Sequence, residues 1–323
     1  MNNKTDSAGA SISEMTRADL PGAVERLSGV SVLVLGDIML DRFVYGAVER
    51  ISPEAPIPVL RIGQETAMLG GAGNVLRNLA ALGARPHGIA VVGEDAAGAE
   101  IEELARACLT PVEGDIELIR MSAHRTTLKD RFIAAGQQLL RVDRDPEVAL
   151  DAAARERVRH AALTAVARVS AVILSDYGKG LLDEALIAAV IEAAEARGCP
   201  VIVDPKGRDY ARYRGAAWVT PNRRELSEAS GLPTGDDASV VAAARRLIAD
   251  SGVAAVLATR SEQGMTLVSG PAGAETHHLK AEAREVYDVS GAGDTVVAAF
   301  AAALGAGLDA VTAAQLANVA AAI

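Results

Sequence analysis

Residues 287–296 read YDVSGAGDTV, and residues 297–305 continue as VAAFAAALG. Glycine tolerates a positive φ angle and lets other groups approach the backbone closely. Gly291, Ala292 and Gly293 therefore predict a tight turn into a helix that begins near Asp294. The first N–H groups of such a helix lack partners inside it, and the helix dipole adds positive charge there. The stretch predicts a helix start that can hold a phosphate.

Asp294 has two possible roles at this helix start. A carboxylate there can take a proton from an attacking hydroxyl while the N–H groups hold the charge of a transferring phosphoryl group. An acidic side chain in the first turn can equally complement the helix dipole and do nothing more. Chemistry alone leaves the two roles open.

The sequence before this turn alternates between short β-type runs and longer alanine-rich segments of helical period. This alternation predicts an α/β fold in which helices cover a parallel sheet. The clearest expected strands are 30–36, 88–93, 171–176, 200–205, 216–222 and 253–260.

A polar side chain ends or follows each of these runs. In open α/β sheets the ligand crevice lies at the carboxyl ends of the strands, so these side chains together predict a site at that edge. Any single one can instead be the N-cap of the next helix. The polar residues are Asp37, Glu94, Asp176, Asp204, Asn222 and Arg260.

Two stretches, 42–66 and 115–144, are richer in β-branched, aromatic and charged residues. Prolines at 53, 56 and 58 suit an edge strand or a loop. We expect a small additional sheet that forms a lid over the crevice or a dimer contact. The expected organisation is a disordered tail at 1–18 and one domain at 19–323 that carries both stretches as insertions.

The composition favours small-molecule chemistry. The chain has 323 residues, half of them apolar, and can bury a large core. A formal net charge of −10 without long blocks of like charge gives no electrostatic footprint for nucleic acid or an anionic membrane. The N-terminal segment lacks an apolar leader, and no segment reaches the roughly 18 apolar residues of a membrane span. We expect a cytoplasmic protein.

Several common site motifs are absent from the sequence. No G-x-x-x-x-G-K-[ST] loop occurs, and the residues before GGAGNV at 70–75 form a poor strand. Neither a Walker-type loop nor a Rossmann cofactor site is therefore expected. The histidines and cysteines show no metal-ligand spacing.

Four short motifs together resemble the ribokinase-like carbohydrate kinases. They are GAGD at 291–294, GD-x-x-x-D at 36–41, GG-A-x-N at 70–74 and N-x-x-E at 222–225. The resemblance covers about residues 30–323 and implies a three-layer α/β sandwich with a mostly parallel central sheet and a small β-sheet lid. It also implies ATP-dependent phosphoryl transfer to a sugar.

Longer strings resemble the D-glycero-β-D-manno-heptose 7-phosphate kinases within that group. The resemblance implies phosphorylation at O1 to the 1,7-bisphosphate, a step towards ADP-heptose and lipopolysaccharide. Some members carry a fused nucleotidyltransferase domain, and here we expect a separate protein to transfer the adenylyl group. Another sugar or sugar phosphate is the alternative acceptor, because one fold hosts many substrates. The strings are RISPEAPIPV (50–59), TTLKDRF (126–132), QQLLRVD (137–143), SDYGKG (175–180) and DPKGRDYARYRGA (204–216).

The resemblance assigns catalytic roles to the helix start. It implies that Asp294 is the catalytic base and that Gly291, Ala292 and Gly293 form the anion hole. Magnesium held mostly by phosphate and water oxygens would suit the lack of a dense carboxylate cluster.

Asn222 and Glu225 match the motif that orients Mg²⁺ and the ATP phosphates, through water. The same spacing is also typical of a helix start with Asn as N-cap and Glu at the third position. Both interpretations are open from the sequence.

Sugar hydroxyls need fixed acceptors and amides, which makes Asp37, Asp41 and Asn74 the expected sugar ligands. Gly70 and Gly71 would let the sugar approach the backbone. For Asp37 the alternative is a turn residue.

The phosphate of the sugar requires cations. Lys179 is the first candidate, with Arg141 and Arg125 from the expected lid behind it. A solvated lysine is the alternative for Lys179.

The remaining expectations concern the nucleotide, a cation and a partner. Asp288 and Ser290 fall where some family members bind a monovalent cation, which makes K⁺ a possible cofactor beside ATP and Mg²⁺. We also expect a homodimer formed through the lid. The expected nucleotide-binding residues are Lys206, Asn222, Glu225, Thr259, Arg260, Gly264 and Asn318.

Overall fold

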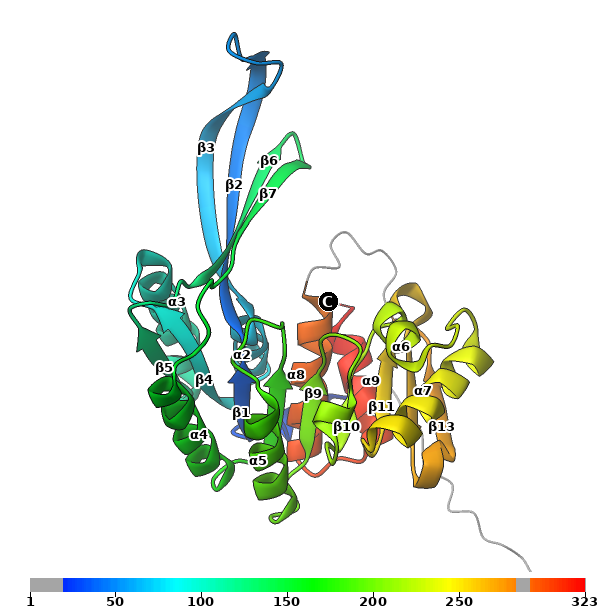
Figure 1. Ribbon diagram of the computed structural model, residues 1–323. Coiled ribbons are helices and arrows are strands. Elements are labelled where there is room, and N and C mark those ends of the chain that lie inside the picture. The colour runs from blue at the N-terminus through cyan, green and yellow to red at the C-terminus, as the bar shows by residue number, and fades with distance from the viewer. Residues whose placement is uncertain (1–19, 283–290, 323) are drawn as a thin grey trace, which may run out of the picture.

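The computed structural model describes residues 20–282 and 291–322. Among these residues, nine strands form one sheet in the order β13-β12-β11-β10-β9-β8-β1-β4-β5 (Figure 1). The strand β12 pairs antiparallel with both β11 and β13, and the other neighbours in this sheet are parallel. The strands are β1 Ser31–Gly36, β4 Arg85–Gly93, β5 Asp115–Met121, β8 Ala171–Ser175, β9 Val201–Asp204, β10 Trp218–Val219, β11 Val256–Thr259, β12 Met265–Ser269 and β13 Glu275–Leu279.

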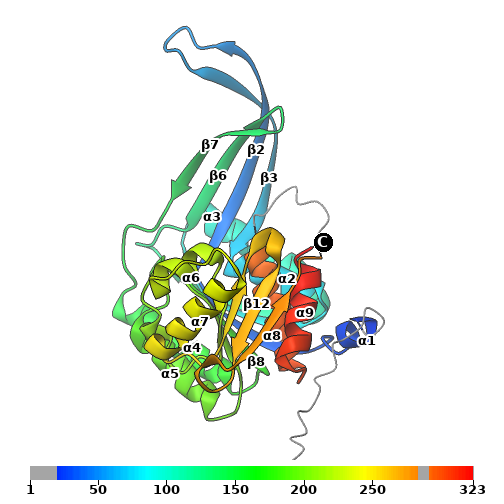
Figure 2. The ribbon, with the colours of Figure 1, turned by 90° about the vertical axis from the view of Figure 1, so that its right-hand side faces the viewer.

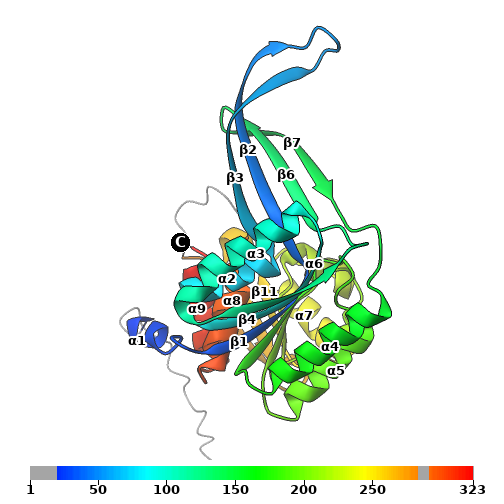
Figure 3. The ribbon, with the colours of Figure 1, turned by 90° about the vertical axis from the view of Figure 1, so that its left-hand side faces the viewer.

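Helices cover both faces of this sheet, so the expected α/β sandwich is confirmed (Figures 2 and 3). The helices α4, α5, α6 and α7 lie on one face, and α1, α2, α3, α8 and α9 lie on the other. Their bounds are α1 Leu20–Glu25, α2 Ala72–Ala81, α3 Ala96–Leu109, α4 Ala152–Val166, α5 Glu184–Glu195, α6 Arg223–Ser230, α7 Asp237–Ser251, α8 Ala292–Gly305 and α9 Ala310–Ala320.

The central strands read as continuous apolar runs because both of their faces are buried. In β1, Leu33 and Leu35 pack against the α4–α7 layer, whereas Val32 and Val34 pack against the layer of α2 and α8. Successive side chains of a strand point to opposite faces, so alternate residues of β1 pack into different cores. All six strands expected from the sequence are present, as β1, β4, β8, β9, β10 and β11.

A second sheet of four strands, in the order β3-β2-β6-β7, rises from the carboxyl edge of the main sheet (Figure 1). Its strands are β2 Ile38–Ile51, β3 Pro58–Gly71, β6 Thr127–Ala134 and β7 Gln137–Arg144. The expected small sheet therefore exists, but its boundaries differ from the expected 42–66 and 115–144.

Residues 115–121 do not belong to the small sheet. They form β5, which pairs in parallel with β4 at the edge of the main sheet. The apolar side chains of this strand explain the difference, because Ile119 and Met121 are buried in the main core. The hairpin of β2 and β3 also extends further into the main domain than the expected range 42–66. Leu40 and Leu69 at its base are buried in the core.

The expected disordered tail at 1–18 lies outside the described residues. Within residues 20–282 and 291–322, no helix has the length and apolar character to cross a membrane.

Candidate active site

The glycine-rich turn leads into α8 at the carboxyl edge of the main sheet. Gly291 is the N-cap of α8 and has a left-handed backbone with φ of 84°. A Cβ atom at Gly291 would lie 2.6 Å from Nδ2 of Asn74, so only glycine allows this approach. Space is open where a Cβ atom of Gly293 would lie. The predicted turn and helix are both present, with the helix beginning at Ala292.

Asp294 is the third residue of α8 and is only 5% exposed. Its Oδ2 accepts a hydrogen bond of 2.7 Å from Nδ2 of Asn74, and its Oδ1 accepts one of 2.7 Å from the hydroxyl of Tyr177. Burial raises the pKa of Asp294, and the two hydrogen bonds oppose that rise. A carboxylate that only complemented the dipole would remain in solvent, because burying a charge is costly. The burial of Asp294 thus favours a chemical role.

A cavity of about 170 Å³ lies beside Asp294. This volume is smaller than the roughly 300 to 1,000 Å³ of most small-molecule sites, so it suits phosphate groups better than a whole nucleotide. Residues at the ends of β8, β9, β10 and β11 meet the start of α8 around it. The lining residues include Asp176, Tyr177, Asp204, Lys206, Thr220, Asn222, Glu225, Thr259, Gly291, Gly293 and Asp294.

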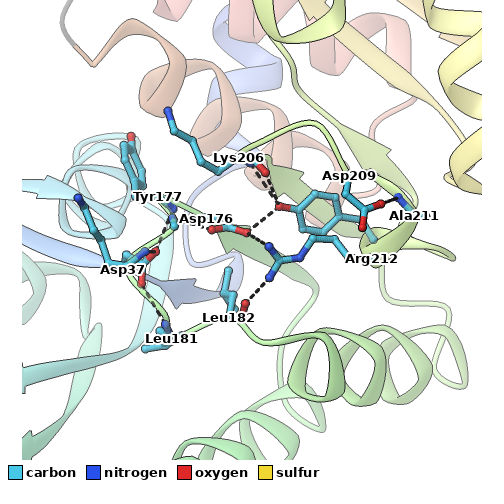
Figure 4. Close-up of polar contacts among 12 residues, drawn as sticks. Asp37, Asp176, Tyr177, Leu181, Leu182, Lys206, Asp209, Ala211 and Arg212 are labelled. Carbon is cyan, nitrogen blue, oxygen red and sulfur yellow. Dashed lines mark hydrogen bonds and ion pairs between the residues drawn. The ribbon is translucent and has the colours of Figure 1, made fainter. Parts of the chain in front are cut away.

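Asp37 directly follows β1, and its side chain holds the turn that follows β8 (Figure 4). Its carboxylate accepts hydrogen bonds from the backbone N–H groups of Tyr177, Lys179 and Leu181, at 2.9, 3.0 and 3.3 Å. Burial raises the pKa of Asp37, and these hydrogen bonds lower it. The structure therefore supports the turn-residue alternative for Asp37, with the sugar-ligand role left as a prediction.

Gly70 and Gly71 make room for groups of the protein itself. A Cβ atom at Gly70 would lie 2.1 Å from Oδ2 of Asp41, and one at Gly71 would lie 2.5 Å from the carbonyl oxygen of Asp37. Asp41 forms an ion pair of 2.6 Å with Arg131. These contacts explain both glycines without a sugar.

Lys179 is not a freely solvated side chain. Its Nζ lies 2.6 Å from Oδ2 of Asp145, and the side chain is 23% exposed. Arg141 and Arg125 are more than half exposed and pair with Asp143 and Glu147 respectively.

Two further cations on β6 were not among the expected site residues. Lys129 lies across from Asp41 in the parallel pairing of β6 with β2, and its Nζ is 5.9 Å from the centre of the Tyr177 ring. Burial lowers the pKa of Lys129, while the nearby carboxylates of Asp41 and Asp143 raise it. Arg131 is two residues further along and pairs with Asp41. Strand alternation within TTLKDRF places both cations on one face and is the signal that identifies them.

Asn222 and Glu225 form a capping box at the start of α6. Oδ1 of Asn222 accepts from the N–H of Glu225, and Oε2 of Glu225 accepts from the N–H of Asn222, both at 3.0 Å. The capping interpretation is therefore confirmed. Both residues also line the cavity, so the capping box does not exclude a role towards a metal or phosphate.

The expected nucleotide-binding residues fall into two groups. Lys206 and Thr259 line the cavity beside Asp294. Arg260 does not, because its buried guanidinium bonds to Asp237, Thr266 and Gln263.

Gly264 and Asn318 contact another part of the chain, the end of β13 and the residue after it. A Cβ atom at Gly264 would lie 2.0 Å from the carbonyl oxygen of Leu279. Nδ2 of Asn318 donates a hydrogen bond of 2.6 Å to the carbonyl oxygen of Lys280. Nucleotide binding by Gly264, Asn318 and Arg260 stays a prediction.

Asp288 and Ser290, the expected cation site, lie outside the described residues.

Asp204 and Tyr177 also line the cavity. The sequence had placed Asp204 among the strand-end residues of the expected site without a specific role, and it had not singled out Tyr177. Asp204 ends β9, and burial together with the nearby Asp294 and Glu225 raises its pKa well above the usual range. Its position at a strand end was visible in the sequence. The approach of Tyr177 to Asp294, 117 residues apart, was not visible there.

The layered fold, the small sheet and a buried aspartate at a glycine-rich helix start agree with the expected class, the ribokinase-like sugar kinases. Residues 30–323 match the pfkB family of carbohydrate kinases, and the chain belongs to this family.

Among curated proteins, "Bifunctional protein HldE" of Rhodospirillum rubrum is 55% identical over 300 residues, covering 93% of this chain. The protein of the same name from Paramagnetospirillum magneticum is 54% identical over 302 residues. The chain spans 60% of the length of each.

Solved structures share the fold at low sequence identity. Ribokinase of Arabidopsis thaliana complexed with ribose and ATP superposes with a TM-score of 0.70 at 22% identity, covering 91% of this chain and 92% of that one. Phosphofructokinase-2 of Escherichia coli in complex with fructose-6-phosphate gives a TM-score of 0.72 at 21% identity, covering 91% of this chain and 93% of that one. The expected ribokinase-like fold is thereby confirmed.

Proposed function

We propose that this chain transfers the γ-phosphoryl group of ATP to O1 of D-glycero-β-D-manno-heptose 7-phosphate, as a step towards ADP-heptose and lipopolysaccharide. The observation that carries the phosphoryl transfer is the buried Asp294 at the start of α8, beside a cavity of phosphate size. Identity of 54 to 55% to bifunctional HldE proteins and the strings quoted above support the heptose as acceptor.

In this reaction Asp294 takes the proton of the sugar O1 hydroxyl as O1 bonds to the γ-phosphorus. The bond from that phosphorus to the bridging oxygen of ADP breaks, and ADP leaves with the electron pair. The N–H groups at Gly291, Ala292 and Gly293 would hold the charge on the transferring group. Asn74 keeps the carboxylate oriented through its hydrogen bond of 2.7 Å.

The cavity contains oxygen ligands of the kind that Mg²⁺ prefers. Asp204 and Glu225 supply carboxylates there, and Asn222 supplies an amide oxygen. Among the described residues, no group of three or more metal-ligating side chains is close enough to hold an ion without help. Asn222 and Glu225 would therefore hold Mg²⁺ through water, with phosphate oxygens completing the shell. When bound, the ion would neutralise charge on the ATP phosphates.

The phosphate of the acceptor would bind to the cations beside Tyr177. Lys129, Lys179 and Arg131 are partly buried, and Lys129 experiences the charge of the other two. Two of the three pair with carboxylates, Lys179 with Asp145 and Arg131 with Asp41. A phosphate dianion would compete for the same donors. Arg125 and Arg141, both exposed, would add to the attraction.

The phosphates of the nucleotide would lie in the cavity beside Asp294, which Lys206 and Thr259 line. Lys206 is placed to contact a phosphate of ATP.

Turnover of a substrate panel tests the acceptor. Release of ADP is measured with heptose 7-phosphate, fructose 6-phosphate, ribose and related sugars, and mass spectrometry identifies the product. We expect the highest kcat/KM with heptose 7-phosphate. Faster turnover of a hexose or pentose substrate would replace the heptose assignment by that of another pfkB-type sugar kinase.

The small sheet would also form a homodimer. It carries exposed apolar side chains at Ile51, Ile57, Ile62 and Leu140, each more than half exposed. Its outer strands β3 and β7 leave backbone hydrogen-bonding groups available at the edges of an open sheet. Pairing of two small sheets would cover these surfaces.

A further inference from the structure

We propose that Tyr177 is a positioning residue for the catalytic carboxylate, which it holds ionised and correctly oriented for the sugar hydroxyl. The inference rests on the proposed role of Asp294 as the base. It assigns a specific task to the turn after β8.

The turn at 176–182 is fixed from two sides (Figure 4). Asp37 accepts three backbone N–H groups of the turn, as described above. Asp176 accepts the N–H of Gly178 at 2.8 Å and the hydroxyl of Tyr213 at 2.6 Å, and Arg212 lies 3.5 Å from the same carboxylate. Gly178 and Gly180 have φ of 68° and 99°, values that suit glycine. Two buried carboxylates thus immobilise the backbone that carries Tyr177.

The Tyr177 hydroxyl can only act as the donor towards Asp294. Burial and the neighbouring carboxylates raise the pKa of Tyr177 far above its ordinary value, so the phenol keeps its proton. Its hydrogen bond of 2.7 Å to Oδ1 complements the bond from Asn74 to Oδ2. A carboxylate has about four lone-pair sites, so two donors fix its plane and leave sites free for the sugar proton.

The charges around Asp294 make this donor necessary. Asp41 on β2 is a carboxylate close enough to raise the pKa of Asp294, and Arg77 on α2 lowers it. Asp294 in turn helps to raise the pKa of Asp204 on β9. Glu225 and Lys206 line the same cavity. The negative charges of Asp41 and Asp204 also contribute to the raised pKa of Tyr177. Only Asn74 and Tyr177 donate hydrogen bonds to Asp294 from side chains of the described residues. Loss of the phenol would leave the buried carboxylate with one side-chain donor beside the acidic Asp41.

The sign of the effect follows from the donor. A hydrogen bond to the ionised form lowers the pKa of the carboxyl group, so its loss in Tyr177→Phe raises that pKa. The base must be ionised to act, and the acid limb of the kcat/KM profile therefore moves to higher pH. We expect a shift of about one pH unit or more. At pH values well above the acid limb, kcat/KM of Tyr177→Phe should recover substantially towards the wild-type value, since Phe fills the same space.

Tyr213→Phe is the matched control. It removes a buried phenol that donates to Asp176 in the same turn and makes no contact with Asp294. A loosened turn would lower the rate in both variants without moving the acid limb. Only a direct effect on Asp294 moves the limb in Tyr177→Phe alone. An acid limb at the wild-type pH in Tyr177→Phe overturns the inference.

A measurement without substrate separates this inference from the proposed function. The free energy of unfolding is measured for wild type, Tyr177→Phe, Asp294→Asn and the double variant as a function of pH. We expect a coupling between the two sites at pH 7 that fades as acid protonates Asp294. Additive effects at every pH would overturn the role of Tyr177. Wild-type turnover in Asp294→Asn would instead remove the base itself and, with it, the proposed mechanism.

Discussion

At the scale of single residues, Asp294 combines a location that favours anions with burial that opposes its own charge. The start of α8 supplies unpaired N–H groups, and Asn74 supplies a further donor. A general base works best when its pKa lies near the working pH. Burial raises the pKa of this carboxyl group in that direction.

Asp294→Asn should lower kcat by roughly 10² to 10⁴, the scale of a lost general base. The amide keeps the shape of the carboxylate, so the thermal midpoint and the affinity for ATP should change little. Steady-state kinetics and calorimetry measure both. Asp309→Asn is the control, because Asp309 caps α9 and asparagine caps equally well. An undiminished kcat in Asp294→Asn would contradict the assignment.

Lys129 is the second residue whose role can be isolated. Lys129→Met should raise KM for the sugar phosphate by about 10-fold to 100-fold, because a hydrogen bond to a charged group is lost. The KM for ATP should stay near the wild-type value. Initial rates at varied concentrations of each substrate measure the two constants. Arg168→Ala, an exposed cation after α4, is the control. Equal changes in both KM values would argue against a phosphate site at Lys129.

At the scale of elements, α6 shows how one motif serves structure and chemistry together. Its capping box satisfies backbone groups that the helix start leaves unpaired. The same two side chains line the cavity. Substitutions that keep the cap can therefore separate the two tasks.

Asn222→Ser should keep the stability of the protein within about 0.5 kcal/mol, because serine is also a good N-cap. It should still raise the Mg²⁺ concentration needed for half-maximal rate, since the amide is lost. Asn222→Ala should do this and also cost about 1 kcal/mol of stability. Denaturant unfolding and Mg²⁺ titrations of the rate provide the data. Asp236→Ala, in the capping box of α7, should lower stability alone. A normal Mg²⁺ dependence in Asn222→Ser would leave capping as the only task.

At the scale of the whole molecule, the small sheet extends beyond the compact sandwich (Figure 1). Its base is anchored in the main core by Leu40, Leu69 and Leu128. Its outer half has no such cover, and exposed apolar side chains gather there. The same sheet carries Asp41, Lys129 and Arg131, so its position would also affect the proposed site for the sugar phosphate.

Sedimentation at micromolar concentration should show a dimer that Ile62→Lys converts to a monomer. Ile62→Lys would place a charge on a surface that the dimer covers. Burying this charge would cost desolvation energy, and keeping it in water would hold the two surfaces apart, so either outcome weakens association. Val24→Lys, at an exposed apolar position on α1, is the control and should stay dimeric. A single monomeric species in the wild type would count against dimerisation through this sheet.

The sequence by itself determined the layered α/β architecture, all six expected strands and the helix start at Gly291–Asp294. These features are local, because hydrophobic period and glycine positions act over a few residues. It did not separate β5 from the small sheet, since only the pairing with β4 and burial of Ile119 place that strand.

Tertiary structure alone decided which polar side chains are free to act. It ties Asp37 to a turn and Arg260 to a buried network, and it brings Tyr177 to Asp294 and Lys129 to the ring of Tyr177. The physical reason is that hydrogen bonding and burial depend on partners distant in the chain. Tyr177 reaches Asp294 only because β8 ends and α8 begins at the same edge of one folded sheet.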